Sequence, residues 1–216
     1  MRIIVSLFCL LLVTIAAAQI PTPAEVLSRA IDYHDPEGQW SSLDATMQFQ
    51  ETRPSGPDRN TVAVINNAAG YFKLNRNDEE IHGMKMDSCF VEKGDFDCAR
   101  AARMRNYYIY LWGLPMKLMD EGTVLAEETK EVVYNGIPCY GISVAYEEDE
   151  WTYFLARDNY RMIAYMFFKP RGQEKGEYIL LENEIEVNGI KIPKERSWYT
   201  LPDSVFLGTD ILVGYE

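Results

Sequence analysis

The segment from 176 to 199 constrains the fold more than any other stretch, because its residue pattern describes a β-hairpin. In its first half, apolar residues fall on one face and glutamates on the other, which is the two-residue period of a half-buried strand. Asn188-Gly189 then supplies two residues that tolerate positive φ, the strongest local signal for a two-residue turn. This turn fixes the register of the two strands. The predicted facing pairs are Val187 with Ile190, Glu186 with Lys191 and Ile185 with Ile192.

Short strands and tight turns account for most of the remaining sequence. Further strands are predicted at 44–51, 61–66, 71–75, 81–86, 89–92, 123–134 and 137–146, separated by Asn, Gly and Asp turn residues. The run from Met162 to Phe168 is apolar on both faces, with Met162, Ala164, Met166 and Phe168 expected on one of them. The sequence therefore predicts an α+β protein that is mainly β, built on a curved antiparallel sheet packed on a few helices.

Two helices are predicted. Thr22 can cap the first, Pro23 fits its first turn, and Glu25 lies near its positive end. The second runs from Ala99 to Trp112, where good helix formers precede a cluster of aromatic residues. His34 ends the first helix and either packs there or serves a metal or catalytic site; the lack of a second His or Cys at ligand spacing favours packing.

Residues 1–18 have the pattern of a secretory signal peptide. Arg2 provides the positive start, 3–15 are apolar, and three alanines ending at Ala18 form the cleavage site. The bulky Phe8 directly before Cys9 disfavours lipid attachment at that cysteine. We therefore expect cleavage near Ala18 and a single domain, 19–216, in the periplasm or outside the cell. No other run is long and apolar enough to predict a transmembrane helix.

The composition is acidic. A formal net charge of −12 and a sequence pI near 4.7 argue against nucleic acid or an anionic membrane as the main partner. We expect a monomer.

Arg100, Arg103 and Arg105 form the basic cluster of this acidic chain. A solvated helix face and an anion site both fit this cluster, with the solvated face favoured.

The cysteines that follow the signal peptide indicate one disulfide. Cys89 and Cys98 flank a short segment with a Lys-Gly turn signal, and export places them in an oxidising compartment, so they form the natural pair. Cys139 follows a second Asn-Gly turn and falls in a predicted strand. We expect it to be a free, buried thiol that behaves as a small hydrophobic residue.

Motifs of the common enzyme classes are missing from the sequence. It contains no G-x-S-x-G elbow, H-E-x-x-H pair, P-loop or dinucleotide fingerprint, and its two histidines leave little for general base chemistry. The sequence therefore predicts a protein that is not an enzyme and that has no catalytic residues, no metal site and no cofactor.

Two groups of residues resemble known families. One strand pair and the Asn-Gly hairpin look like the envelope lipoprotein-sorting fold of the LolA/LolB type. The matching residues are Trp151, Tyr153, Phe154, Leu155, Asp158, Tyr160, Glu184, Val187, Asn188, Gly189, Ile190, Lys191, Ile192 and Pro193. The segments 33–36 and 113–118, with Trp40, resemble a family of uncharacterised secreted bacterial proteins. The sorting-protein resemblance implies a half-open antiparallel barrel wrapped over helices, with an apolar cavity for acyl chains and a lipoprotein as possible cargo.

The hairpin register also predicts a ligand site. Lys194 and Arg196 follow two isoleucines on the inward face, so their charged groups must reach water, a carboxylate or an anionic group of a ligand. Cations reaching water at the rim of the sheet are the equally supported alternative. The predicted ligand-binding residues are Met162, Met166, Phe168, Ile185, Ile192, Lys194, Arg196 and Trp198. We expect an apolar or acylated ligand, with a non-catalytic protein-interaction module of the envelope as the alternative function.

Overall fold

The computed structural model describes residues 19–216; the predicted signal peptide, 1–18, lies outside the described residues. The helical segments are α1 (Pro23–His34), η1 (Trp40–Ser42), α2 (Cys98–Trp112) and η2 (Met116–Met119). The strands are β1 (Asp44–Thr52), β2 (Arg59–Asn66), β3 (Tyr71–Arg76), β4 (Glu80–Lys85), β5 (Ser88–Lys93), β6 (Lys130–Tyr134), β7 (Ile137–Ala145), β8 (Glu150–Ala156), β9 (Met162–Phe168), β10 (Gly176–Val187), β11 (Ile190–Leu201) and β12 (Phe206–Tyr215). The α+β, mainly β class is confirmed.

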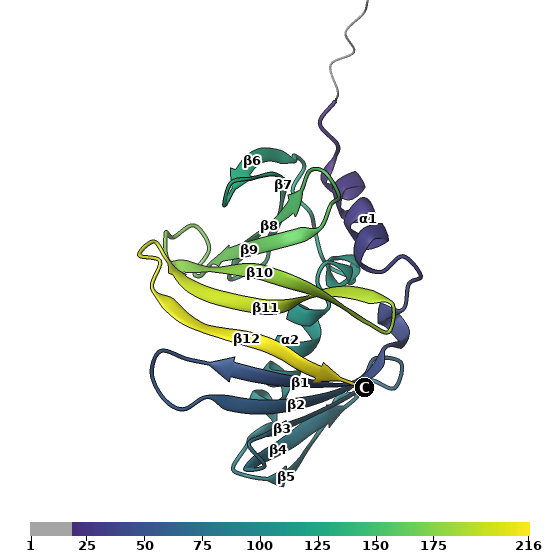
Figure 1. The fold of residues 1–216 in the computed structure, drawn as a ribbon, viewed down its shortest axis with the longest axis vertical. Helices are drawn as coiled ribbons and strands as arrows, with labels where there is room; N and C mark the ends of the chain where they lie inside the picture. Colours follow the sequence, from purple (N-terminus) through teal and green to yellow (C-terminus); the bar gives the residue numbers. More distant parts are fainter. Residues whose placement is uncertain (1–18) are drawn as a thin grey trace, which may run out of the picture.

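All twelve strands belong to one antiparallel sheet, in the order β5-β4-β3-β2-β1-β12-β11-β10-β9-β8-β7-β6 (Figure 1). The chain builds β1 to β5 outward to one edge, crosses through α2 to the opposite edge, and returns strand by strand from β6 to β12. There β12 pairs with β1, and Thr46 and Glu216 exchange two backbone hydrogen bonds. The pairing of the first and last strands therefore joins both halves into one sheet.

The sheet curves around α2, which lies behind the central strands in Figure 1. The helix is linked to β5 by the Cys89–Cys98 disulfide and to β8 by a hydrogen bond between Tyr110 and Tyr153. In a flat sheet these two strands would lie roughly 40 Å apart, whereas the two points of attachment on α2 are only about 18 Å apart along the helix axis. The sheet therefore bends over the helix without closing, as expected for a half-open barrel.

The predicted Asn-Gly hairpin is confirmed in its turn and its register. Asn188 and Gly189 both have positive φ, and the facing pairs are those expected from the sequence. The pairs are Val187 with Ile190, Glu186 with Lys191 and Ile185 with Ile192. Farther along, Asn183 also has positive φ, and its side chain donates a hydrogen bond to Glu195.

Both predicted helices are present. Thr22 and Glu25 form a capping box at the start of α1, and Asp97 caps α2 by accepting a hydrogen bond from the backbone of Arg100. The strand expected at 123–134 begins only at Lys130. Before it, Leu125 makes a single bridge to Val144, so this segment is a strand over its last part alone.

The predicted common face of β9 is wrong at Met162. Phe154 pairs with Ala164 but Leu155 pairs with Met162, so Ile163 is an extra residue in a β-bulge. The extra residue turns Met162 to the face that carries the helices, hereafter the inner face. Ala164 stays on the opposite, outer face.

Two apolar clusters on the inner face make up the main core. One joins Tyr108 and Trp112 of α2 to β1, β2, β3 and the tip of the β10–β11 hairpin. The other joins Leu111 of α2 and the buried side of α1 to the strands from β7 to β10. A smaller cluster around Phe154 lies on the outer face. Since α2 contributes to both inner clusters, it is the element that the sheet packs against over most of its width.

The predicted disulfide between Cys89 and Cys98 is present, with a Cα–Cα distance of 5.5 Å. It ties the edge strand β5 to the first residue of α2. Cys139 is free and buried in β7, as expected.

We predict that Cys98→Ser lowers the free energy of unfolding by about 2–3 kcal/mol, because the disulfide limits the freedom of the unfolded chain. Urea denaturation followed by tryptophan fluorescence measures this, with fully reduced wild type as the matched control. Equal midpoints for oxidised and reduced wild type would contradict the prediction.

His34 joins α1 to two strands, which agrees with the packing interpretation. The ring is 1% exposed, and its Nδ1 lies 2.6 Å from the carbonyl oxygen of Lys191 in β11. The backbone N–H of Met162 in β9 donates to Nε2 at 3.0 Å. These partners require a neutral ring with its proton on Nδ1. Burial lowers the pKa of His34 from 6.5 to about 4.

We predict that His34 makes folding pH-dependent. Below pH 6.5 the unfolded chain protonates this ring, whereas the folded protein resists protonation until about pH 4. The contribution of His34 to the free energy of unfolding is therefore fully present above pH 6.5. It falls by roughly 3 kcal/mol as the pH drops toward 4. Denaturation of wild type and His34→Ala at pH 4.5 and 7.5 measures this. If both proteins lose the same stability between these pH values, His34 is not the cause.

Candidate functional site

The candidate site is a cavity of about 410 Å³ between α2 and the strands at the centre of the sheet. Its volume lies in the range of small-molecule sites, roughly 300–1,000 Å³. The lining combines arginines, carboxylates and apolar side chains. The lining residues are Glu51, Thr52, Arg53, Arg59, Arg76, Arg100, Met104, Tyr107, Glu177, Trp198, Leu207, Gly208 and Asp210.

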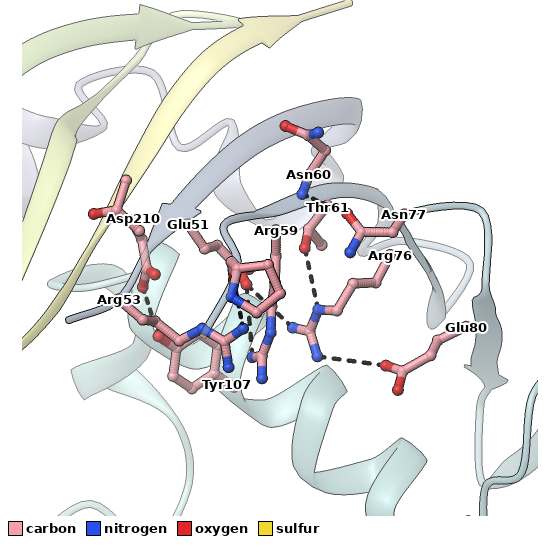
Figure 2. Close-up of polar contacts among 12 residues, drawn as sticks. Glu51, Arg53, Arg59, Asn60, Thr61, Arg76, Asn77, Glu80, Tyr107 and Asp210 are labelled. Atoms are coloured by element: carbon pink, nitrogen blue, oxygen red, sulfur yellow. Dashed lines mark hydrogen bonds and ion pairs between the residues drawn. The ribbon is translucent and has the colours of Figure 1, made fainter. Parts of the chain in front are cut away.

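Four arginines reach this cavity from four separate elements. Arg53 follows β1, Arg59 begins β2, Arg76 ends β3, and Arg100 lies in the first turn of α2. The β1–β2 and β3–β4 hairpins end at the same side of the sheet, so their arginines meet there although they lie far apart in sequence. In Figure 2 the side chains of Arg53, Arg59 and Arg76 extend toward the same space above α2.

Glu51 holds part of this arginine cluster in place. Its carboxylate lies 3.4 Å from Arg76 and 4.0 Å from Arg59, and it also accepts a hydrogen bond from the Tyr108 hydroxyl. The Nε of Arg76 donates to the hydroxyl of Thr61 at 3.3 Å. Arg76 is therefore a fixed, buried part of the wall.

Glu80 pairs with the remaining side of the cluster. It lies 3.7 Å from Arg76 and 3.4 Å from Arg100. Arg100 also packs its guanidinium over the ring of Phe96, 4.1 Å from the centroid. Arg100 is thus held by an ion pair with Glu80 and by packing on Phe96.

Arg53 and Arg59 are less well matched with acceptors. Arg53 donates to the carbonyl of Pro57, and its buried Nε has no hydrogen-bond partner within residues 19–216. Burial lowers the pKa of Arg59, and the positive charges of Arg76 and then Arg53 lower it further. The guanidinium groups therefore repel one another at this end of the cavity, and an anion placed among them would relieve that repulsion.

The other end of the cavity is aromatic. The rings of Tyr107 and Trp198 stack with centroids 5.6 Å apart. Both donate to the carboxylate of Asp210, at 2.6 Å from the Tyr107 hydroxyl and 3.1 Å from the indole N–H. Burial raises the pKa of Asp210 and that of Glu177.

A second hollow of about 770 Å³ continues along α2 and shares Met104 and Tyr107 with the first cavity. Along the helix its lining mixes apolar side chains with Arg103, Arg105 and Asn106. Lys117, Asp120, Trp151 and Lys169 complete the lining. Together the two hollows, hereafter the α2 groove, offer an arginine-rich end at the first hollow and a larger end that combines apolar side chains with four cations.

The structure does not bring the eight predicted ligand-binding residues together. Trp198 lines the α2 groove, while Ile185 and Ile192 pack in the core beneath the hairpin. Met162 borders a narrow crevice beside His34. Met166 packs in the outer-face cluster, and Phe168 is half-buried at the end of β9.

Arg196 lies against α2 instead of at a cavity mouth. It is 1% exposed, its guanidinium lies 3.8 Å from the centroid of the Trp112 ring, and it donates to the carbonyl of Leu111. Burial lowers its pKa. Lys194, two residues earlier, is half-buried. In this arrangement Arg196 supports the C-terminal turn of α2.

Six arginines line the α2 groove, and the predicted basic cluster supplies three of them. Arg100 lines the first hollow, and Arg103 and Arg105 line the second, where Arg105 also donates to the carbonyl of Met86. The local sequence around Arg53, Arg59 and Arg76 does not predict that they meet, because each stands at the end of a different strand. Their only shared feature in the sequence is a position next to a predicted turn.

The fold defines the class of protein. It resembles a LolA superfamily protein from Nitrosomonas europaea, with a TM-score of 0.57, 8% identity, and 91% of this chain and 94% of that chain covered. A candidate outer-membrane lipoprotein-sorting protein domain from Vibrio parahaemolyticus gives a TM-score of 0.54 at 8% identity, covering 89% and 90%. A DUF1329 family protein from Desulfovibrio piger gives 0.52 at 10% identity, covering 89% and 92%. The chain therefore has a LolA-like fold.

The sequence matches the model of a family of unknown function (DUF6503) over residues 1–214, and the chain belongs to that family. No curated protein matches it significantly. Between residues 19 and 216, no helix has both the length and the hydropathy needed to cross a membrane. Over the same residues, no three His, Cys, Asp or Glu side chains are grouped to hold a metal ion.

We predict that Arg196 acts through packing. Arg196→Ala should lower the free energy of unfolding by about 2–4 kcal/mol by leaving a void under Trp112. Arg196→Met should lose much less, because it keeps the bulk and removes the cost of burying a charge. Thermal unfolding compares them, with Lys194→Ala as a control expected within about 0.5 kcal/mol of wild type. Equal losses for the Ala and Met variants would indicate that the charge itself is required.

Proposed function

We propose that this protein is an exported envelope protein that binds an apolar or acylated ligand, such as a lipid or a lipoprotein acyl chain, without catalysis. The observation that carries the proposal is the α2 groove, which consists of two adjoining hollows of about 410 and 770 Å³ on the inner face. A groove of this size with an aromatic lining suits an elongated apolar molecule.

Three further observations support the proposal. The fold is shared with a LolA superfamily protein and a candidate lipoprotein-sorting domain. The first 18 residues have the pattern of a signal peptide, and the Cys89–Cys98 disulfide suits an oxidising compartment. Met104 and Tyr107 line both hollows, so the two hollows adjoin along α2.

Met104 provides the test, because it lines both hollows. We predict that Met104→Glu weakens binding of a fluorescent fatty acid at least tenfold, since a carboxylate in the groove disfavours an apolar chain. The readout is saturable fluorescence enhancement on titration.

Val133→Glu is the matched control. It introduces the same charge at a side chain that is 71% exposed on β6, and it should bind as wild type does. If wild type shows no saturable binding, the proposal fails and the interaction-module alternative gains. Equal binding by the Met104 variant would place any ligand outside the α2 groove.

A further inference from the structure

The arginine-rich end of the α2 groove contains more positive charge than the proposed apolar ligand requires. Arginine side chains ordinarily lie on the surface of a protein, where water solvates them. Here they converge on a cavity, and Arg76 is only 8% exposed. Keeping several guanidinium groups together in a partly buried space opposes folding unless something offsets it.

Four carboxylates lie around the four arginines, but they pair with them unevenly. Glu51 is shared between Arg76 and Arg59, and Glu80 between Arg76 and Arg100, while Glu177 lines the cavity without an ion pair to any of the arginines within the described residues. Asp210 already accepts hydrogen bonds from Tyr107 and Trp198 at the aromatic end. No salt bridge to a carboxylate is present for Arg53 within the described chain, and its Nε is left without an acceptor.

The donors that remain suit a phosphate group. Guanidinium groups bind phosphate and carboxylate through paired N–H donors, and phosphate has enough oxygens to accept from more than one arginine. A phosphate monoester carries about −1.5 to −2 charges at neutral pH, whereas a carboxylate carries one. Two under-matched arginines beside a third therefore favour phosphate over carboxylate.

We propose that Arg53 and Arg59, backed by Arg76, bind a phosphate group that forms the anionic head of the ligand. The inference rests on the proposed function for the apolar part of the ligand, which occupies the groove along Met104 and Tyr107. The phosphate can belong to a lipid headgroup or to a free phosphate compound, since the same donors recognise both.

The test compares two molecules that share one acyl chain, lysophosphatidate and the corresponding monoacylglycerol. Wild type should bind lysophosphatidate at least tenfold more tightly. Arg59→Gln should remove most of this difference by weakening the binding of lysophosphatidate. Arg59 is the suitable position, because its side chain is 34% exposed and its neighbour Glu51 keeps its ion pair with Arg76.

The control is Arg171→Gln, which removes the same charge in the exposed β9–β10 loop. Arg171→Gln should keep the full preference for lysophosphatidate. If Arg171→Gln and Arg59→Gln weaken this preference equally, the preference arises from the net charge of the protein and the proposal is overturned. Calorimetry with inorganic phosphate forms a separate arm. Binding of inorganic phosphate that depends on Arg59, without binding of either lipid, would support the phosphate site and overturn the proposed function.

Two other results would overturn the phosphate site alone. Equal affinity of wild type for lysophosphatidate and monoacylglycerol would leave the apolar groove intact and show that the arginines do not bind the head. A fatty acid that binds as tightly as lysophosphatidate, with the same dependence on Arg59, would identify a carboxylate as the preferred anion.

Discussion

The packing of α2 against the inner face of the sheet is the interaction on which the rest of this structure depends. Twelve twisted strands present a wide apolar face that must be covered. Three tyrosines of α2 help to meet this need, since their hydroxyl groups bond to two adjacent strands in the middle of the sheet and to a third strand farther along it. Tyr107 donates to Asp210 in β12, Tyr108 to Glu51 in β1, and Tyr110 bonds to Tyr153 in β8. The middle of the sheet thereby bends around α2.

The same contacts create the α2 groove. A single helix is too narrow to fill the inner face of a curved sheet, so hollows remain along its side. Tyr107 supports the helix and forms part of the wall of both hollows, and Glu51 accepts from Tyr108 while it holds Arg76. The disulfide fixes the start of α2, two residues before Arg100. Stability and the shape of the candidate site therefore depend on shared residues.

The comparison with LolA-like structures separates fold from ligand chemistry. About 8% identity suffices to keep the fold, because the fold requires the pattern of buried and exposed positions and not particular residues. The side chains that line the groove are free to differ between such proteins. The ligand class of this chain therefore depends on its own lining residues, among them Arg53, Arg59 and Arg76.

The sequence by itself determined what short-range chemistry controls: the Asn188-Gly189 hairpin and its register, both helix starts, and the 89–98 disulfide across nine residues. It also indicated the fold class, since period-two patterns and turns dominate. The tertiary structure alone decided the β1–β12 pairing, the bulge at Ile163 and the meeting of the arginines. The β1–β12 pairing and the meeting of the arginines depend on contacts between segments distant in sequence, where the packing of the whole sheet outweighs local preference. The bulge lies within one hairpin, but no turn residue or change of pattern in the sequence marks it. Arg196 followed the predicted face, but only the position of α2 determined that it would be buried against Trp112.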